Sequence, residues 1–167
     1  MIVYVHGPSL VQYLAQKEDP LVSEGDRDRT HDNVILWLGR YCEVSDCRAV
    51  VVFDDLPPDD VRTPVERRGR VRVLNLPHGG DAMREIGGPA NRSSAEERTL
   101  VVTDDHRLRS ALERGAATVL SPGQFVTRAR QSMRPEDEMK PDEPDEKFAG
   151  LTDEEVQFWL RYFENER

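Results

Sequence analysis

The chain of 167 residues is poor in cysteine and contains no long apolar run. Cys42 and Cys47 are too few for a disulfide framework, and no second pair of cysteines or histidines stands at zinc-ligand spacing. Reduced thiols in a cytoplasmic protein are therefore expected. The apolar residues 1–5 are too short to span a membrane and lack the basic flank of a signal peptide, so no membrane association is expected.

Basic residues are scarce near the end of the chain. Residues 135–167 hold 12 acidic and 4 basic residues, whereas residues 1–134 hold 20 and 19, so the tail carries nearly all of the net charge of −9. A uniformly acidic protein would repel phosphate backbones, but a neutral body can still present a basic face. Nucleic acid therefore stays open as a partner of the body, and the tail could shield such a face or dock elsewhere.

Five short apolar runs rich in β-branched residues predict strands that are buried on both faces of a sheet. They cover residues 2–5, 49–53, 71–76, 100–103 and 118–120. Segments with helical spacing lie between them, and this alternation predicts an α/β fold with a central parallel sheet flanked by helices. Residues 6–8, 17–30 and 57–70 are expected to be loops.

Local signals predict where individual helices begin and end. An apolar stripe over residues 34–41 follows a cluster of capping residue types at positions 30–33. A second stripe over residues 108–112 stops ahead of a glycine. Ser121 and Pro122 are typical of an N-cap and a first helical residue, so a third helix is expected to begin there.

Composition divides the chain into three parts. Residues 1–130 form the predicted α/β domain, residues 131–150 read as an acidic linker, and residues 151–167 predict an amphipathic helix. The helix presents Val156, Trp159, Leu160 and Phe163 on one side. A helix this short is marginal alone, so its apolar side should pack on the domain, on a second copy of the chain, or on another protein.

Ionisable residues follow four of the predicted strands. They are His6, the pair Asp54 and Asp55, Asp81, and the pair Asp104 and Asp105. The carboxyl ends of parallel strands meet at one edge of the sheet, which is where ligands bind in such folds. Clustered carboxylates repel one another unless a cation neutralises them, and hard oxygen ligands suit Mg²⁺ or Mn²⁺. Such ions could activate water for attack on a phosphodiester. The alternative is that each aspartate caps a helix or completes a turn.

The order of these motifs resembles a known family. The segments HGPSL, AVVVFDD, GGDAM, LVVTDDHRLRSALERGA and TVLSPGQF follow one another as in the NYN domain, in the YacP-like branch of the PIN-like ribonucleases. The resemblance covers roughly residues 1–130 and implies a PIN-like three-layer fold. In active relatives it implies an endoribonuclease that depends on Mg²⁺ or Mn²⁺ and acts on RNA, and no DNA is expected.

The resemblance also assigns roles to individual residues. Asp54, Asp81 and Asp105 match the family's acidic positions, and with His6 they are the expected catalytic set. The expected metal ligands are Asp81, Asp105 and the additional carboxylate of Asp104.

The first family motif departs from its pattern. The family begins with Asp-Gly-Tyr-Asn, and here His6 stands at the Asp, Pro8 at the Tyr and Ser9 at the Asn. A neutral imidazole adds no negative charge and is a softer ligand than a carboxylate, so Mg²⁺ binding should weaken. The sequence Gly-Gly-Pro at residues 87–89 is also expected to break the helix after Asp81.

Three functions are compatible with this pattern. The residues favour a degenerate NYN domain that binds RNA or a protein without cutting. The second is an active nuclease in which Asp104 supplies the missing charge and His6 binds Mn²⁺ or handles protons. The third is a phosphoacceptor module with Asp54 as acceptor. The chain lacks the acid pair after the first strand and the later lysine that such a module requires.

Arginines supply the candidate contacts to RNA phosphates. The stretch from residue 62 to 72 is the most basic of the chain and contributes Arg68 and Arg70. Arg84 and Arg107 are expected near the acidic edge, and Ser9 completes the predicted RNA-binding set. The alternative is that these arginines are solvated charges that balance nearby acids.

Overall fold

The computed structural model describes residues 1–60, 62–94 and 97–134. In chain order the elements are β1 (Ile2–His6), α1 (Gly7–Gln16), α2 (Arg27–Val44), β2 (Arg48–Leu56), β3 (Val65–Arg68), β4 (Val71–Pro77), the π-helix η1 (Met83–Gly87), α3 (Gly88–Arg92), β5 (Thr99–Val102), α4 (His106–Leu112), β6 (Thr118–Leu120) and α5 (Pro122–Ser132). The predicted acidic linker over residues 131–150 starts too early, because α5 continues to Ser132. The rest of that linker from residue 135 onward and the predicted helix over residues 151–167 lie outside the described residues. In the described part of the chain, no helix is long and apolar enough to cross a bilayer.

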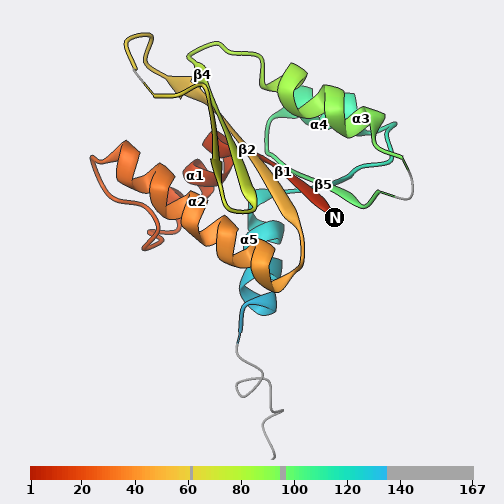
Figure 1. Cartoon of the computed structure of the whole chain (residues 1–167), viewed down its shortest axis with the longest axis horizontal. Helices are drawn as coiled ribbons and strands as arrows, with labels where there is room; N and C mark the ends of the chain where they lie inside the picture. Colours follow the sequence, from red (N-terminus) through yellow and green to blue (C-terminus); the bar gives the residue numbers. More distant parts are fainter. Residues whose placement is uncertain (61, 95–96, 135–167) are drawn as a thin grey trace, which may run out of the picture. The chain divides into compact units, whose positions relative to one another are not determined.

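The strands form one sheet in the order β3-β4-β2-β1-β5-β6. All neighbouring pairs are parallel except β3 and β4, which are antiparallel. The four strands β4, β2, β1 and β5 therefore lie side by side and point the same way, which confirms the predicted α/β fold with a largely parallel central sheet. Their carboxyl ends meet at one edge (Figure 1).

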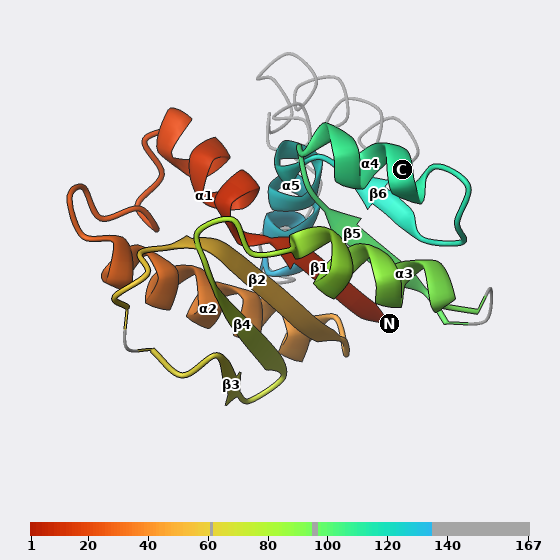
Figure 2. The same cartoon turned by 90° about the horizontal axis from the view of Figure 1, so that it is seen from above.

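Helices cover both faces of this sheet, as the doubly buried apolar strands predict. Helices α1, α2 and α5 lie on one face, and η1, α3 and α4 lie on the other (Figures 1 and 2). On the first face, Val3 and Val5 of β1 pack in one core cluster with Leu38 and Phe125. On the second face, residues of β2, β4 and β5 pack around Ile86 in a separate cluster.

The helix starts were predicted with mixed success. Helix α5 begins as expected, with a capping box in which Ser121 and Gln124 exchange hydrogen bonds. Helix α2 begins earlier than predicted, because the carboxylate of Asp26 accepts a hydrogen bond from the amide of Arg29 and caps the helix there. The predicted loop at residues 6–8 is wrong as well, since α1 begins directly after β1, with Pro8 in its first turn.

Two further segments differ from the sequence-based expectations. Part of the predicted loop at 57–70 is strand β3, which forms a hairpin with β4. Gly69, with φ of +59°, takes a turn position that suits glycine. The predicted helix break at residues 87–89 is also wrong. The chain passes from the π-helical turn η1 into α3, and Pro89 lies in the first turn of α3, where a missing N–H costs nothing.

Candidate functional site

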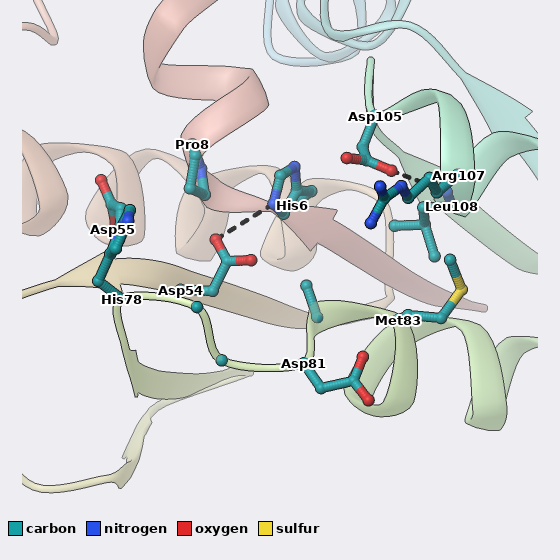
Figure 3. A pocket seen from close by; sticks show the side chains of 13 residues that line it. His6, Pro8, Asp54, Asp55, His78, Asp81, Met83, Asp105, Arg107 and Leu108 are labelled. Atoms are coloured by element: carbon teal, nitrogen blue, oxygen red, sulfur yellow. Dashed lines mark hydrogen bonds and ion pairs between the residues drawn. The ribbon is translucent and has the colours of Figure 1, made fainter.

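A pocket of about 370 Å³ opens at the carboxyl ends of the central parallel strands (Figure 3). It is lined by His6, Pro8, Asp54, Asp55, His78, Gly79, Gly80, Asp81, Ala82, Met83, Asp105, Arg107 and Leu108. The structure thus brings all four residues of the predicted catalytic set to one place. We call this the carboxylate pocket.

The histidine at the end of β1 links three segments of the pocket. Its Nε2 lies 3.3 Å from Oδ1 of Asp54, and its Nδ1 lies 2.7 Å from Oγ of Ser9. Ser9 Oγ in turn accepts a hydrogen bond from the backbone N–H of Asp104. When the Ser9 hydroxyl donates to Nδ1, Nε2 carries the proton and donates to the Asp54 carboxylate. His6 therefore connects β1 and α1 to the end of β2 and to the loop after β5.

The glycine after this histidine allows the close packing that positions it. A Cβ added to Gly7 would lie 2.3 Å from Cδ1 of Phe53 and 2.8 Å from the carbonyl oxygen of Val52. Both residues belong to β2, so any larger residue would push the start of α1 away from that strand. The order His-Gly-Pro thus places the imidazole beside Asp54 and begins the helix at once.

The other predicted catalytic aspartates hold the starts of helical segments. Oδ1 of Asp105 accepts a hydrogen bond from the amide of Leu108 at 2.8 Å and caps α4. Oδ1 of Asp81 accepts one from the amide of Arg84 at 3.0 Å. Figure 3 shows Asp81 and Asp105 on opposite sides of the pocket, with Asp54 turned toward His6. Asp81 and Asp105 therefore line the pocket and also cap helical segments. The alternative that these aspartates serve as helix caps accounts for them equally well.

Asp104, the third predicted metal ligand, does not line the carboxylate pocket. Its side chain is 58% exposed, and the nearest guanidinium nitrogen, on Arg109, is 4.0 Å away. The two neighbouring aspartates separate because the Thr103 hydroxyl accepts from the amide of Asp105 while Ser9 accepts from that of Asp104. The structure therefore does not gather Asp81, Asp104 and Asp105 at one point.

A divalent cation is what the sequence resemblance implies for this edge. Across residues 1–60, 62–94 and 97–134, no three His, Cys, Asp or Glu side chains come close enough to hold a metal ion. The reason lies in the donors, because Asp54 faces an imidazole while Asp81 and Asp105 each give one oxygen to a backbone amide. The donor set in this arrangement does not fit a divalent cation, and we assign no chemical step to one.

The predicted RNA-binding residues are dispersed. Arg107 lines the carboxylate pocket, and Arg84 lies nearby but pairs with Glu85. Arg68 and Arg70 flank the β3–β4 turn at the other end of the sheet. Their guanidinium groups form ion pairs, Arg68 with Asp32 and Glu66, and Arg70 with Asp46. Ser9 is buried against His6. The structure therefore does not place this set on one continuous surface.

Sequence reasoning missed His78 and Met83 as pocket residues. His78 follows β4 much as His6 ends β1. This similarity in sequence position could have indicated that His78 lies in the pocket. The turn after it is tight, because Gly79 has φ of +83° and a Cβ on Gly80 would lie 2.6 Å from Cβ of Leu76. Met83 belongs to η1, whose π-helical turn no sequence pattern indicated.

Outside the carboxylate pocket, His31 of α2 packs against β2. The His31 ring stacks on Phe53 with ring centroids 3.8 Å apart, and its Nδ1 lies 3.1 Å from a guanidinium nitrogen of Arg62. Burial lowers the pKa of His31 to about 4 against the opposing effect of Asp55, with the Arg62 and Arg27 guanidinium groups acting in the same direction as burial. His31 is therefore neutral at physiological pH and serves the packing of α2 on β2.

Comparisons with known proteins identify the fold. No family model matches the chain, and no curated protein matches it by sequence. The structure is similar to a crystal structure of Rae1 (YacP) from Bacillus subtilis, with a TM-score of 0.64 and 20% identity over 98% of this chain and 92% of that one. A mutant of the same protein gives a TM-score of 0.60 and 19% identity over 78% and 76%. The chain thus has the fold of Rae1 (YacP), in agreement with the YacP-like fold that its motifs resemble.

Proposed function

We propose that this protein binds RNA through its nuclease-related fold and does not cleave it in a metal-dependent reaction. The observation that carries the second part is the contact between His6 and Asp54, 3.3 Å apart. In the family pattern a carboxylate stands at the position of His6, and two carboxylates this close would need a cation between them. The imidazole instead gives Asp54 a hydrogen-bond donor from within the chain.

The neighbouring aspartates support the same proposal. Asp81 and Asp105 each have one oxygen committed to a helix start, and Asp104 lies outside the carboxylate pocket. An active nuclease with a rearranged ligand set would need Asp104 to turn toward Asp81 and Asp105. In the structure the Asp104 side chain is instead 58% exposed, with the Arg109 guanidinium 4.0 Å away.

RNA is the proposed partner because of the fold and the charge distribution. The domain has a nuclease-related fold, and residues 1–134 are nearly neutral despite the net charge of −9 of the whole chain. A nearly neutral body can present a basic face, and several of its arginines are exposed and available for phosphate contacts. A protein partner for residues 151–167 lies outside the described residues and stays a prediction.

Binding and cleavage can be separated in one experiment. The full chain is mixed with labelled single-stranded RNA in MgCl2, in MnCl2 or in EDTA, with binding read by fluorescence anisotropy and cleavage by gel. We expect binding that is independent of the metal, salt-sensitive and without loss of intact RNA. Cleavage that requires metal and disappears in Asp105→Asn would overturn the non-cleaving part. No binding even at low salt would overturn the RNA part.

A further inference from the structure

One face of the sheet is only partly covered by helices. On this face the core cluster with η1, α3 and α4 buries Val52, Leu74 and Val101, toward the carboxyl ends of the strands. Toward the amino ends of β1, β2 and β4 the same face holds an open pocket of about 440 Å³. In Figure 2, α2 lies behind β2 and β4, and no labelled helix lies in front of them.

The strand register identifies the side chains that share this open region. Tyr4 of β1 pairs with Val50 of β2, Val50 pairs with Arg72 of β4, and Arg72 pairs with Arg67 of β3. These four residues form one row across four neighbouring strands, about 14 Å from end to end at the usual strand spacing. Side chains alternate along a strand, so the row belongs to the face that carries Val52.

A second row lies next to the first. Ile2 of β1 pairs with Arg48 of β2. Both residues line the same pocket as Tyr4, Arg67 and Arg72. We call the region formed by Ile2, Tyr4, Arg48, Val50, Arg67 and Arg72 the arginine face. It has a half-buried floor of aliphatic and aromatic side chains with exposed guanidinium groups around it.

The charges of the arginine face are not balanced locally. Within the described residues, Arg48, Arg67 and Arg72 take part in no ion pair. Arg68, one residue further along β3, points to the opposite face and pairs with Asp32 and Glu66. Glu66 also lines the pocket but pairs with Arg68, so the three exposed guanidinium groups of Arg48, Arg67 and Arg72 outnumber the acids there and favour a polyanionic ligand.

The tyrosine of the floor adds a second kind of contact. Tyr4 is only partly buried and lines the pocket, so part of its side chain is accessible to a ligand. Burial, together with Glu97, raises the pKa of Tyr4, and the phenol therefore stays neutral at physiological pH. An aromatic ring beside phosphate-binding arginines is the usual arrangement for stacking an unpaired base. In a duplex the bases are already stacked, so an A-form helix would not offer them to Tyr4.

We infer that the arginine face binds single-stranded RNA, with Arg48, Arg67 and Arg72 at phosphates and a base stacked on Tyr4. This inference rests on the proposed RNA-binding function but places the RNA away from the carboxylate pocket. The strand would lie across β1, β2, β4 and β3, where it meets a surface complementary in charge. The carboxylate pocket, with four acidic side chains on its wall, would repel the same phosphates.

The test measures the affinity of the full chain for a fluorescein-labelled oligouridylate over a range of salt concentrations. The double variant Arg67→Gln/Arg72→Gln should weaken binding about tenfold or more at low salt. It should also reduce the slope of log K against log salt by about 1.4, the value for two lost phosphate contacts on a single strand. Tyr4→Leu should weaken binding about tenfold and leave the slope unchanged.

A matched control removes the same charge from the other side of the sheet. Arg40→Gln/Arg128→Gln changes two exposed arginines on α2 and α5 and should alter affinity less than twofold. The replaced arginines are exposed in both double variants, and thermal unfolding followed by circular dichroism checks that each remains folded.

The possible outcomes distinguish a wrong location of the RNA-binding site from an absence of RNA binding. If the unmodified protein binds and Arg67→Gln/Arg72→Gln binds equally well, the arginine face is not the site, while RNA binding stands. Equal weakening by the two double variants would also overturn the location, because it would mean a general effect of net charge. If the unmodified protein binds no RNA at low salt, the proposed function and this inference both fail.

Discussion

Nε2 of His6 and Oδ1 of Asp54 lie 3.3 Å apart, and this pairing defines the carboxylate pocket. The two side chains are 12% and 21% exposed, so the contact is largely shielded from water. An imidazole at this point satisfies the Asp54 carboxylate, and the neighbouring Ser9 fixes the ring from the other nitrogen. The Asp54 carboxylate therefore has a hydrogen-bond partner from within the chain.

Replacing this histidine by an acid should create an affinity for divalent metal ions in the carboxylate pocket. His6→Asp puts two carboxylates in close contact, which should lower the free energy of unfolding by about 1 kcal/mol or more in EDTA. We expect MnCl2 to raise the thermal midpoint of His6→Asp and to leave the unmodified protein unchanged. Calorimetric titration with MnCl2 measures the affinity directly.

The control for this change is His6→Asn, which removes the imidazole without adding charge. It should lose stability through the broken hydrogen bonds but gain no response to MnCl2. If His6→Asp also fails to respond, then Asp54, Asp81 and Asp105 do not lie within reach of a common ion, even with the missing charge restored.

The glycine after His6 should be sensitive to the smallest enlargement. Gly7→Ala places a methyl group 2.3 Å from Phe53, in the middle of β2, and should destabilise the protein by about 3 kcal/mol. Gly39→Ala is the matched control, because nothing lies within 4 Å of its added Cβ and the residue is inside α2. It should stabilise by about 0.5–1 kcal/mol. Urea unfolding measures both, and equal effects would contradict the close approach of α1 to β2.

The sheet could be predicted because its signal is strong and local. Runs of buried β-branched residues at 2–5, 49–53, 71–76 and 100–103 correspond to β1, β2, β4 and β5 within a few residues. Parallel order follows from alternation with helices, and it fixed the edge at which the acids meet. The edge strand β3 was missed because it pairs on one side only and carries charged residues, so its composition is that of a loop.

The sequence predicted the edge of the sheet at which the side chains of the site lie, but not the direction in which each side chain points. Both Asp104 and Asp105 follow β5, yet only Asp105 lines the carboxylate pocket. That choice depends on Ser9, 95 residues away in the chain, which accepts from the Asp104 amide. The His6–Asp54 contact likewise depends on the register between β1 and β2. Long-range contacts of this kind leave no periodic pattern in one sequence.

Asp105 offers a way to separate the cap of α4 from the charge of the carboxylate pocket. Asp105→Asn keeps an oxygen that can accept from the Leu108 amide and should change stability by less than about 0.5 kcal/mol. Asp105→Ala removes the cap and should cost about 1 kcal/mol. Guanidinium unfolding curves of the two variants provide the comparison. Equal losses would mean that the negative charge, and not the hydrogen bond, stabilises the start of α4.

Protonation of His31 should weaken the fold as the pH falls. Its pKa in the folded protein is about 4, below the ordinary value of 6.5, because burial disfavours the charged ring. Between these two pH values the unfolded chain binds the proton more readily than the folded one. The stabilising effect of neutral His31 is therefore present above about pH 6.5 and is lost progressively toward pH 4.

The size of this loss can be measured with a variant that keeps the stacked ring but cannot titrate. The lowering of the His31 pKa corresponds to a loss of at most about 3 kcal/mol in the free energy of unfolding, and contact of the ring with solvent would make this loss smaller. His31→Phe retains a ring on Phe53 while Arg62 keeps its ion pairs with Asp28 and Asp60. Urea unfolding of both proteins from pH 6.5 down to pH 4 should show a steeper loss for the unmodified chain, since other titrating groups act equally in both. Parallel curves would mean that His31 is protonated in the folded protein without penalty, which would contradict its place in the core between α2 and β2.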